Sequence, residues 1–419
     1  MSLRVLFLTE SFHPVLGGGE QHIRTLAGRL VAGGITATVV TRRIQGEWPA
    51  EERLDGIRVV RVAPEGHGRI GKYGMVLPAL DALRRERAGH DVVVVRGTRV
   101  LGLPGLLAAR ALAKAVVLQP ELNGEMSGEV YTWGTPLAAP LPRRLVGASV
   151  ALRNLLLRDA DAFVAMSLLI REELVAAGVP SERVAWIPHG VDTERFRPVA
   201  AGERQALRER FGLPAAARIV VYTGRLLKGK GLDTLLDAFT KVAALDAEAH
   251  LLLVGSGAGQ TLSIEEELRA RAASSGLAGR VTFSGRVEAV EDYLKASDLF
   301  AFPSVFEALG ISLVEAAACG LPAVGSRTGG IVDVIADGVS GLLVTPGSVA
   351  ELEQGLLALL GDAPRRRQMG DEARRIACRR FDLGASVERY RRLFHELAFS
   401  SRSRSWTSRA PRAGATPPR

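Results

Sequence analysis

The sequence predicts an α/β protein with two doubly wound domains, each built on a parallel β-sheet. Short and nearly continuous apolar segments alternate along the chain with segments in which apolar residues recur at helical spacing. Strands that are apolar throughout are typical of parallel sheets, because both faces of such sheets are covered. A chain of 419 residues is also long enough to fold around two separate cores.

The first half of the chain carries the pattern of one such domain. Its expected strands are residues 3–9, 37–41, 57–62, 91–95, 115–118, 162–165 and 184–187. The first strand leads into a glycine-rich turn at Gly17–Gly19, and the helix that follows ends at Gly33 and Gly34. Backbone N–H groups of a glycine-rich turn before a helix can approach an anion closely, although many such turns are only tight connections.

The second half of the chain repeats the alternation. Its expected strands are residues 219–223, 251–254, 281–284 and 299–302. We therefore expect a first domain at 1–190, a linker at 191–216, a second domain at 217–382, a helix at 383–399 and a tail at 400–419. The tail is rich in Ser, Pro and Arg and has no acidic residue, a composition that is typical of disorder.

The net charge of the chain by itself excludes few classes of binding partner. The net charge is +9, but five arginines lie in the tail, so the rest of the chain carries +4. The sequence has no aromatic-rich basic motif of a nucleic-acid-binding module, and we expect no nucleic-acid partner. No apolar run reaches the roughly 18 residues that a membrane span needs.

Neither the cysteines nor the histidines predict a metal site. Cys319 and Cys378 lack metal-ligand spacing and need not pair, and the seven histidines form no ligand pattern. Asp159 and Asp161 have the form of a metal-binding Asp-x-Asp motif, but they fall where a helix runs into a strand, so we expect a structural role. We expect a reduced, cytoplasmic protein that needs no metal and no cofactor.

A second glycine-rich loop, at residues 224–231, follows the strand at 219–223. Gly224, Gly229 and Lys230 match the P-loop of nucleotide triphosphatases. Gly231, however, stands where a P-loop has the Ser or Thr hydroxyl that binds Mg²⁺. The P-loop interpretation therefore lacks one of its ligands.

Two glutamates, Glu307 and Glu315, follow the strand at 299–302, with Gly310 between them. If Gly310 starts a helix, Glu307 lies in the loop at the C-terminal end of the strand and Glu315 lies about one turn inside the helix. Gly320 and Pro322 then end that helix. Ligands of open parallel sheets bind at the carboxyl edge of the strands, near helix N-termini. Two arbitrary glutamates would more often be solvated surface residues.

The run from Glu307 to Glu315 resembles the glutamate–seven residues–glutamate signature of the retaining glycosyltransferases of family 4. Residues 188–198, 224–231 and 329–344 resemble further blocks of that family in the family's order, so the resemblance covers residues 3–398. It implies the GT-B fold, in which two Rossmann-like domains face one another across a cleft. The last helix of such proteins crosses back onto the first domain.

The resemblance implies a site for a nucleotide-sugar donor in which Arg225 and Lys230 clamp the diphosphate. Two fixed cations stabilise the negative charge on a departing nucleoside diphosphate without a metal. Glu307 would contact sugar hydroxyls near the reacting carbon, and Glu315 would bind the ribose hydroxyls. Glu307, Arg225 and Lys230 are the implied catalytic residues. The remaining implied donor contacts are Gly17, Gly18, Leu309, Gly310, Ile311 and, for the base, the backbone beside Val287.

The acceptor side departs from the family pattern. The family often has a histidine in the loop after the fourth strand of the first domain, but residues 118–125 contain none. Glu121, Asn123 and Glu125 are alternative replacements. We expect residues 66–80 and 119–148 to be loop-rich and to bind the acceptor. The helical segment at 140–158 either packs its leucines on the core with solvated arginines or touches an anionic membrane surface.

We predict a metal-independent, retaining hexosyltransferase of polysaccharide biosynthesis. Its donor is a UDP- or GDP-linked sugar, and its acceptor is a hydroxyl of a glycan, a lipid-linked molecule or a small molecule. The protein is cytoplasmic, with a further interpretation as a peripheral protein at the inner face of the cell membrane. Both a front-face mechanism and a double displacement through Glu307 are open. The alternatives are a P-loop-like triphosphatase and a sugar-nucleotide epimerase on the same fold.

Overall fold

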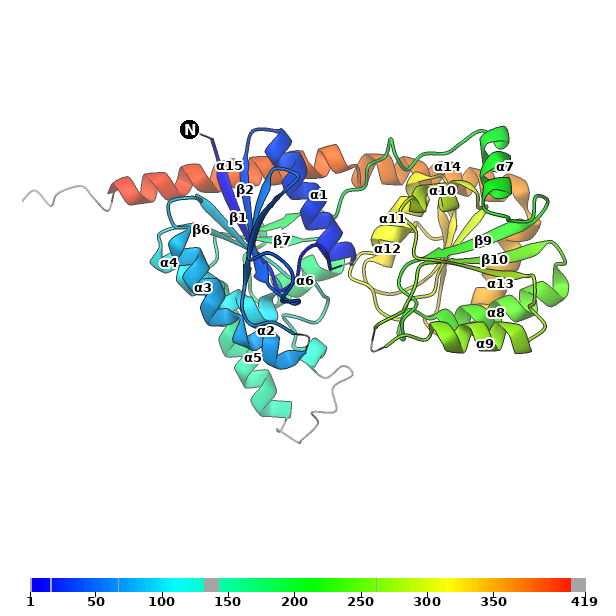
Figure 1. Cartoon of the computed structure of the whole chain (residues 1–419), viewed down its shortest axis with the longest axis horizontal. Helices are drawn as coiled ribbons and strands as arrows, with labels where there is room; N and C mark the ends of the chain where they lie inside the picture. The colour runs from blue at the N-terminus through cyan, green and yellow to red at the C-terminus, as the bar shows by residue number, and fades with distance from the viewer. Residues whose placement is uncertain (1, 16, 67, 132–142, 261, 408–419) are drawn as a thin grey trace, which may run out of the picture. The chain divides into compact units, whose positions relative to one another are not determined.

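The protein consists of two compact units in a computed structural model that describes residues 2–15, 17–66, 68–131, 143–260 and 262–407 (Figure 1). Unit 1 comprises residues 1–165, 170–187 and 387–419, and unit 2 comprises residues 166–169 and 188–386. Each unit has its own sheet of mainly parallel strands with helices on both faces, which confirms the predicted fold class.

Within the described residues, unit 1 is built on an eight-stranded sheet. In spatial order its strands are β3 (Glu51–Leu54), β4 (Ile57–Val62), β2 (Thr36–Arg42), β1 (Arg4–Leu8), β5 (Val92–Arg96), β6 (Ala115–Gln119), β7 (Ala162–Ala165) and β8 (Val184–Trp186). Its helices are α1 (Gly18–Ala32), α2 (Arg69–Gly74), α3 (Val76–Arg85), α4 (Leu103–Ala111), α5 (Arg143–Leu157) and α6 (Leu168–Ala176), with short turns η1 (Thr98–Gly102), η2 (Glu129–Tyr131) and η3 (Ser181–Arg183).

Most strands of unit 1 follow the sequence pattern, whereas the edge strand β3 does not. β3 pairs antiparallel with β4, while the other strand pairs of this sheet are parallel. Asp55 and Gly56 connect β3 to β4, and both have positive φ angles, of 52° and 79°. An Asp-Gly pair is a strong hairpin signal, so the sequence did contain the information. We nevertheless did not expect β3, because it is polar and lacks the apolar run that marks the other strands. An edge strand need not be apolar.

Unit 2 has a six-stranded sheet in the described part of the chain, and all its strands are parallel. Their spatial order is β11 (Val281–Gly285), β10 (Ala249–Val254), β9 (Arg218–Thr223), β12 (Leu299–Phe302), β13 (Ala323–Ser326) and β14 (Gly341–Val344). Its helices are α7 (Ala201–Arg210), α8 (Leu232–Leu245), α9 (Glu265–Ser274), α10 (Val290–Lys295), α11 (Ile311–Ala318), α12 (Ile331–Val334), α13 (Val349–Gly361) and α14 (Ala363–Arg380). Helices α8 and α13 pack together on one face, and α11 and α14 pack together on the other (Figure 1).

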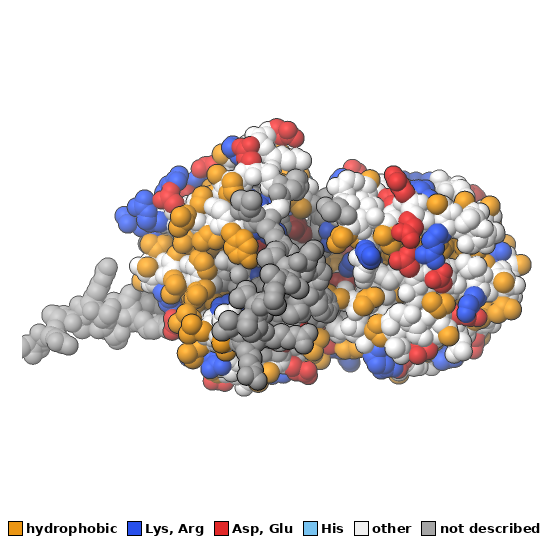
Figure 2. All heavy atoms as spheres, turned by 90° about the horizontal axis from the view of Figure 1, so that it is seen from below, with side chains coloured by type: hydrophobic (Ala, Val, Ile, Leu, Met, Phe, Trp, Pro, Cys, Tyr) orange, Lys and Arg blue, Asp and Glu red, His pale blue; other side chains and the backbone are white. Residues whose placement is uncertain are grey.

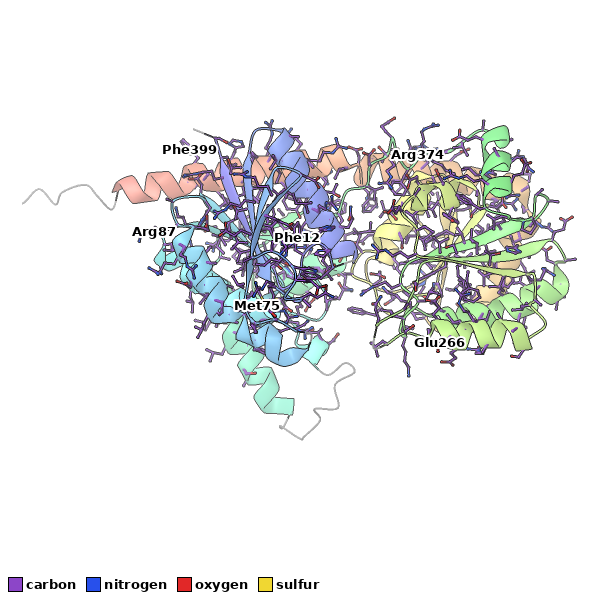
Figure 3. All side chains as sticks on the ribbon, viewed as in Figure 1. Phe12, Met75, Arg87, Glu266, Arg374 and Phe399 are labelled. Atoms are coloured by element: carbon purple, nitrogen blue, oxygen red, sulfur yellow. The ribbon has the colours of Figure 1, made fainter. Side chains whose placement is uncertain are left out.

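The last helix, α15 (Leu383–Thr407), contributes to the core of unit 1 from residue 387 onward. The rings of Phe394 and Phe7 meet edge to face, with centroids 6.4 Å apart. The buried Tyr390 hydroxyl accepts a hydrogen bond of 3.2 Å from Gln119 Nε2. Phe12, in the loop after β1, is 1% exposed and belongs to the same core (Figure 3). Sequence-distant segments therefore form one apolar cluster in unit 1.

The segment after β8 is anchored within unit 2 by one arginine. Arg374 Nη1 of α14 donates hydrogen bonds to the carbonyl oxygens of Thr193, Phe196 and Ala318, at 2.8, 2.7 and 2.8 Å (Figure 3). The residues expected as a linker, 191–216, are part of unit 2 and include α7. Nη1 carries two N–H groups, so one of them is shared between two of these carbonyl oxygens.

Two expected loop segments have more regular structure than the sequence suggested. Residues 66–80 were expected to be loop-rich, but α2 and α3 occupy most of this range, so that expectation is wrong. α15 continues to Thr407, inside the expected tail at 400–419. The rest of the tail, and residues 132–142 of the expected loop at 119–148, lie outside the described residues. In the described part of the chain no helix is both long and apolar enough to cross a membrane.

Candidate active site

The loop after β12 and the helix α11 hold the two glutamates as the sequence predicted. Gly310 is the N-cap of α11 and has a φ of +88°, in the left-handed region that glycine tolerates. Glu307 lies before it in the loop, and Glu315 lies just over one turn inside the helix. Gly320 follows the C-cap, Cys319, with a φ of +76°. The glycines thus place one carboxylate at the edge of the sheet and the other on the helix.

The loop between β9 and α8 packs directly against the loop after β12. Gly231, the N-cap of α8, has a φ of +68°, and a Cβ atom there would lie 2.0 Å from the carbonyl oxygen of Pro303. The backbone N–H of Val305 donates to the carbonyl oxygen of Gly229 over 3.2 Å. β9 and β12 are neighbours in the sheet, so their C-terminal loops meet at one edge.

This packing brings Lys230 onto Glu307. Lys230 Nζ lies 2.7 Å from Glu307 Oε2, and the two side chains are 25% and 18% exposed. A charge-assisted hydrogen bond of this length, shielded from most of the solvent, holds both groups in fixed positions. The ammonium and the carboxylate still reach solvent, so both can also contact a ligand that lies on the edge of the sheet.

Arg225, the second expected cation, lies in the same loop and is exposed. Its backbone carbonyl accepts a hydrogen bond from the buried Tyr222 hydroxyl over 3.2 Å. Its Nη1 is 3.4 Å from Gln260 Oε1, in the loop after β10. The backbone of Arg225 is therefore held in place, whereas its guanidinium is held weakly and can bind an anion.

Glu315 is half-buried in α11, beside an ion pair. Arg195 bonds Glu291 through Nε and Nη2, at 2.8 Å for each contact. Burial raises the pKa of Glu315 to about 8; Arg195 opposes this rise and Glu291 adds to it. A carboxyl group of this kind lacks good partners for its charge, and ligand hydroxyls would supply hydrogen bonds to it.

The other expected donor contacts of unit 2 follow strands of the same sheet. Leu309 and Gly310 are buried, and Ile311 is half-buried at the start of α11. Val287 is half-buried in the segment after β11. Thus the structure brings residues of the loops after β9, β11 and β12 to the carboxyl edge of one sheet, where ligands of doubly wound folds bind.

Two buried hydroxyl groups at this edge escaped the sequence analysis. Thr223 ends β9 and Ser304 follows β12, and these side chains are 2% and 0% exposed. Among the described residues, neither hydroxyl oxygen has a hydrogen-bond partner. Buried hydroxyls normally find a partner. The signal was weak in the sequence, because a Ser or Thr at a strand end has no motif of its own.

Gly17 and Gly18, the remaining expected donor contacts, lie in unit 1 at the start of α1. Gly17 is the N-cap of this helix, in an extended conformation. A Cβ atom at Gly17 would lie 2.2 Å from Glu20 Oε2, and Glu20 Oε1 accepts a hydrogen bond of 2.6 Å from the Ser11 hydroxyl. A carboxylate therefore occupies the space beside the glycines, where the sequence predicted contact with a phosphate and a sugar.

The three candidate residues of the acceptor loop have different environments. Glu125 is 1% exposed, and its carboxylate accepts four hydrogen bonds: two from the backbone and hydroxyl of Thr98, and two from the backbone of Glu121 and Leu122. Asn123 is 6% exposed. The Glu121 side chain is 34% exposed and forms an ion pair with Arg96 at 3.1 Å.

Asp159 and Asp161 have the structural role that the sequence predicted. Arg110 donates to both carboxylates, at 2.9 Å to each, and Asp161 also accepts a bond of 2.8 Å from the backbone N–H of Val116. Across the residues that the structure describes, no group of three or more His, Cys, Asp and Glu side chains could hold a metal ion.

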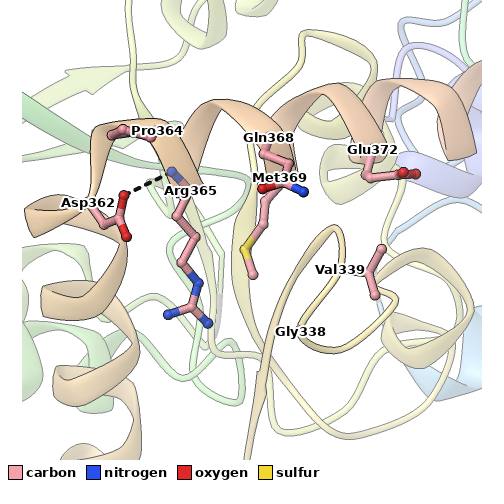
Figure 4. Close-up of a pocket in the computed structure, with 8 residues that line it drawn as sticks. All are labelled: Gly338, Val339, Asp362, Pro364, Arg365, Gln368, Met369 and Glu372. Atoms are coloured by element: carbon pink, nitrogen blue, oxygen red, sulfur yellow. Dashed lines mark hydrogen bonds between the residues drawn. The ribbon is translucent and has the colours of Figure 1, made fainter.

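A cavity of about 580 Å³ lies elsewhere in unit 2, between the start of α14 and the loop before β14 (Figure 4). Asp362 caps α14 by accepting a hydrogen bond of 2.9 Å from the backbone N–H of Arg365. None of the expected site residues lines this cavity. The chemistry predicted from the sequence is therefore not located there.

Two family models match the chain, one over each half. Residues 16–195 match the model described as Glycosyltransferase Family 4, and residues 203–376 match the model of Glycosyl transferases group 1. The D-inositol 3-phosphate glycosyltransferase of Xylanimonas cellulosilytica is 36% identical over 380 residues, which cover 87% of this chain and 88% of the relative. The GDP-mannose-dependent alpha-(1-6)-phosphatidylinositol monomannoside mannosyltransferase of Mycobacterium tuberculosis is 31% identical over 391 residues, which cover 88% and 92%.

Solved structures share the fold at lower identity. Sucrose-phosphate synthase from Thermosynechococcus elongatus superimposes with a TM-score of 0.80 at 23% identity, over 95% of this chain and 100% of that chain. HepE of Anabaena in complex with UDP has a TM-score of 0.73 at 22% identity, over 94% and 100%. From these matches and the two-sheet architecture, the chain belongs to glycosyltransferase family 4 and is a glycosyltransferase with the GT-B fold.

Proposed function

We propose that this glycosyltransferase moves a hexosyl group from a UDP- or GDP-linked sugar to a hydroxyl acceptor, with retention at the anomeric carbon and without a metal. The observation that carries the proposal is the contact of 2.7 Å between Lys230 Nζ and Glu307 Oε2. It places a fixed cation and a fixed carboxylate together at the carboxyl edge of unit 2, beside the N-terminus of α11.

The proposed reaction needs both charges. The acceptor oxygen bonds to the anomeric carbon, while the bond from that carbon to the donor phosphate breaks and its electron pair stays on the phosphate. Lys230 and Arg225 stabilise this new negative charge, and fixed cations are most effective where solvent is excluded. Glu307 accepts hydrogen bonds from the donor sugar, and Glu315 accepts them from the ribose.

Two routes are compatible with retention. In a front-face route the leaving phosphate takes the acceptor proton, and Glu307 only binds the sugar. In a double displacement Glu307 attacks the anomeric carbon and forms a covalent intermediate. A mass measurement of the intact protein, mixed with donor in the absence of acceptor, distinguishes them: an added hexosyl mass at Glu307 supports double displacement.

The relatives support a nucleotide-sugar donor but differ in the base. The mycobacterial relative is named as GDP-mannose-dependent, and the Anabaena structures contain UDP or UDP-glucose. The names of the relatives also support acceptors with an inositol or lipid-linked inositol group. We keep both bases in the proposal, together with glycan, lipid-linked and small-molecule acceptors.

A thermal-shift panel tests the proposal directly. UDP, GDP, ADP and their sugar conjugates are added with Mg²⁺ or with EDTA. A ligand at 100 times its Kd stabilises the folded state by about 2.7 kcal/mol. We expect one nucleoside diphosphate to stabilise the protein equally with Mg²⁺ and with EDTA. Stabilisation only by ATP or GTP with Mg²⁺ would favour a P-loop-like triphosphatase instead, and donor isomerisation without an acceptor would favour an epimerase.

The proposal extends to peripheral contact with an anionic membrane through one surface of unit 1. Exposed apolar side chains lie on neighbouring helices α2 to α5: Tyr73, Leu77, Leu107, Leu152, Leu155 and Leu156. Figure 2 shows hydrophobic side chains gathered over this unit. Burial of such side chains among lipid chains stabilises bound amphipathic helices. The experiment is co-sedimentation with anionic vesicles: Leu152→Ser with Leu155→Ser should lower the bound fraction, and an unchanged fraction would exclude this contact.

A further inference from the structure

Lys230 and Glu307 lie on the two sides of the topological switch point of the unit 2 sheet. From β9 the chain moves outward to β10 and β11, whereas from β12 it moves to β13 and β14 on the other side. β9 and β12 are neighbours, and the helices that follow them, α8 and α11, start at this edge. Ligands of open parallel sheets bind at such a point. Unit 2 alone therefore determines this location.

The starts of these two helices suit an anion. Their N-caps are Gly231 and Gly310, which have no side chain to cap the free backbone N–H groups of the first turn. Lys230 directly precedes the N-cap of α8, and Glu307 lies three residues before the N-cap of α11. Phosphate oxygens bind well where a helix N-terminus and a fixed ammonium group are close together. Lys230 is therefore a phosphate ligand with a carboxylate at its side.

The two cations of the β9–α8 loop differ in what they already contact. Lys230 Nζ lies 2.7 Å from Glu307 Oε2, and within the described residues it forms no other ion pair. Arg225 contacts the neutral Gln260 at 3.4 Å and has no carboxylate partner in the same part of the chain. A phosphate that binds Lys230 therefore competes with Glu307, whereas a phosphate that binds Arg225 competes with no charged group.

The product of the proposed reaction carries more charge than its donor. When the sugar leaves, the outer phosphate of the donor becomes a terminal phosphate, whose second pKa of about 6 gives it additional negative charge at neutral pH. Two fixed cations attract this group more strongly than the phosphate of the sugar nucleotide. A site that stabilises the leaving diphosphate therefore also retains it, and release of product then limits turnover.

We propose that Glu307 competes with the phosphate for Lys230, so that the site prefers the sugar nucleotide to the nucleoside diphosphate. This inference rests on the proposed function and gives Glu307 a part in the exchange of product for donor. When a sugar nucleotide binds, its sugar hydroxyls replace Lys230 as partners of the carboxylate, and the phosphate binds the ammonium group. A nucleoside diphosphate brings no sugar hydroxyls, so Glu307 returns to Lys230 and weakens the binding of the phosphate.

The experiment measures dissociation constants of the full chain by isothermal titration calorimetry. The ligands are the nucleoside diphosphate that stabilises the protein best in the thermal-shift panel and its sugar conjugate. Glu307→Gln removes the charge and keeps the shape of the side chain. We expect this variant to bind the nucleoside diphosphate about tenfold more tightly than the wild type, the effect of one hydrogen bond to a charged group. Its affinity for the sugar conjugate should not rise, because the sugar hydroxyls lose the carboxylate.

Two controls separate competition for Lys230 from a general effect of charge. Glu266→Gln removes the same charge at an exposed position of α9 and should leave both dissociation constants unchanged. The double variant Lys230→Ala with Glu307→Gln should bind the nucleoside diphosphate no more tightly than Lys230→Ala alone, because no ammonium group remains to compete for. Circular dichroism checks that each variant is folded.

The possible outcomes distinguish this inference from the proposed function. An unchanged or weaker affinity of Glu307→Gln for the nucleoside diphosphate would overturn the inference, while binding by the wild type keeps the transferase. A gain in affinity that persists without Lys230 would overturn it too, because Glu307 would then only repel the phosphate. If the wild type binds neither a nucleoside diphosphate nor a sugar conjugate, the proposed function itself is wrong.

Discussion

At the scale of single residues, the contact between Lys230 and Glu307 is the interaction on which the proposed function rests. The sequence predicted both residues, which lie 77 positions apart along the chain. It predicted their side chains as separate contacts to the donor, a diphosphate clamp and a sugar ligand. The structure adds that they touch, so a substitution of either one changes the environment of the other.

We predict that Lys230→Ala lowers turnover by about 10²- to 10³-fold, the usual effect of removing one fixed donor from a developing anion. Arg225→Ala should lower turnover at least tenfold for the same reason. Lys228→Ala is the matched control, because this lysine is exposed in the same loop. Steady-state kinetics with the best donor and circular dichroism of each variant provide the measurements. Equal turnover in Lys230→Ala and Lys228→Ala would exclude the clamp.

Glu315 predicts a pH dependence of stability. Its pKa in the folded chain is raised to about 8 from an ordinary value of 4.5. Between these values the unfolded chain has lost the proton while the folded chain still holds it, so rising pH favours unfolding. This contribution is fully present below about pH 4.5 and is lost as the pH rises through 8.

Replacement of Glu315 by Gln removes this titration. The Tm of Glu315→Gln, relative to the wild type, should increase from pH 5 to pH 8.5 (~3.5 units), measured in the absence of nucleotide. Glu266→Gln, at an exposed position of α9 (Figure 3), should show no such trend. A constant difference in Tm between Glu315→Gln and wild type would contradict the assigned pKa shift.

At the scale of elements, the loop from β9 to α8 depends on a close approach between two backbones. Gly229 and Gly231 both have left-handed φ angles, of +88° and +68°. A Cβ atom at Gly231 would collide with the carbonyl oxygen of Pro303 at 2.0 Å, whereas a Cβ atom at Gly229 meets nothing within 4 Å. Substitution of Gly229 therefore tests backbone strain alone, whereas substitution of Gly231 adds a steric clash with Pro303.

We predict that Gly229→Ala lowers the free energy of unfolding by about 1 to 2 kcal/mol, the strain of a left-handed alanine. Gly231→Ala should lower it by more, since Pro303 or the loop must also move, and it should reduce turnover because Lys230 shifts. Urea denaturation and steady-state kinetics measure these effects. Equal losses of stability in the two variants would show that the approach to Pro303 is not rigid.

At the scale of the whole molecule, α15 completes a core that begins at β1. Phe394 is 0% exposed and packs on Phe7, whereas Phe399 on the same helix is 79% exposed (Figure 3). We predict that Phe394→Ala lowers the free energy of unfolding by about 3 to 5 kcal/mol, as large-to-small substitutions in cores do. Phe399→Ala should change it by less than about 0.5 kcal/mol. Chemical denaturation of both variants tests the difference, and a small effect of Phe394→Ala would place α15 outside the core.

Much of this architecture could be predicted, because local sequence patterns indicate where strands and helices begin and end. The buried strands are continuous apolar runs, and Gly310 and Gly320 mark the ends of α11 as sequence rules say. The expected strands match β1, β2 and β4 to β12 closely, whereas β13 and β14 were not among them. The edge strand β3 and the helices α2 and α3 were missed, because a polar edge strand and short helices leave weak periodic signals.

The sequence by itself determined the two α/β units, the family and the residues of the expected donor site. It could do so because strand burial, helix ends and glycine-rich turns depend on residues near one another in the chain. Only the tertiary structure decided which side chains touch: Lys230 with Glu307, Arg96 with Glu121, and Phe394 with Phe7. These contacts join loops or elements that are distant in the sequence. Their distances depend on how neighbouring strands pair and on where glycine allows two backbones to approach, which no local pattern encodes.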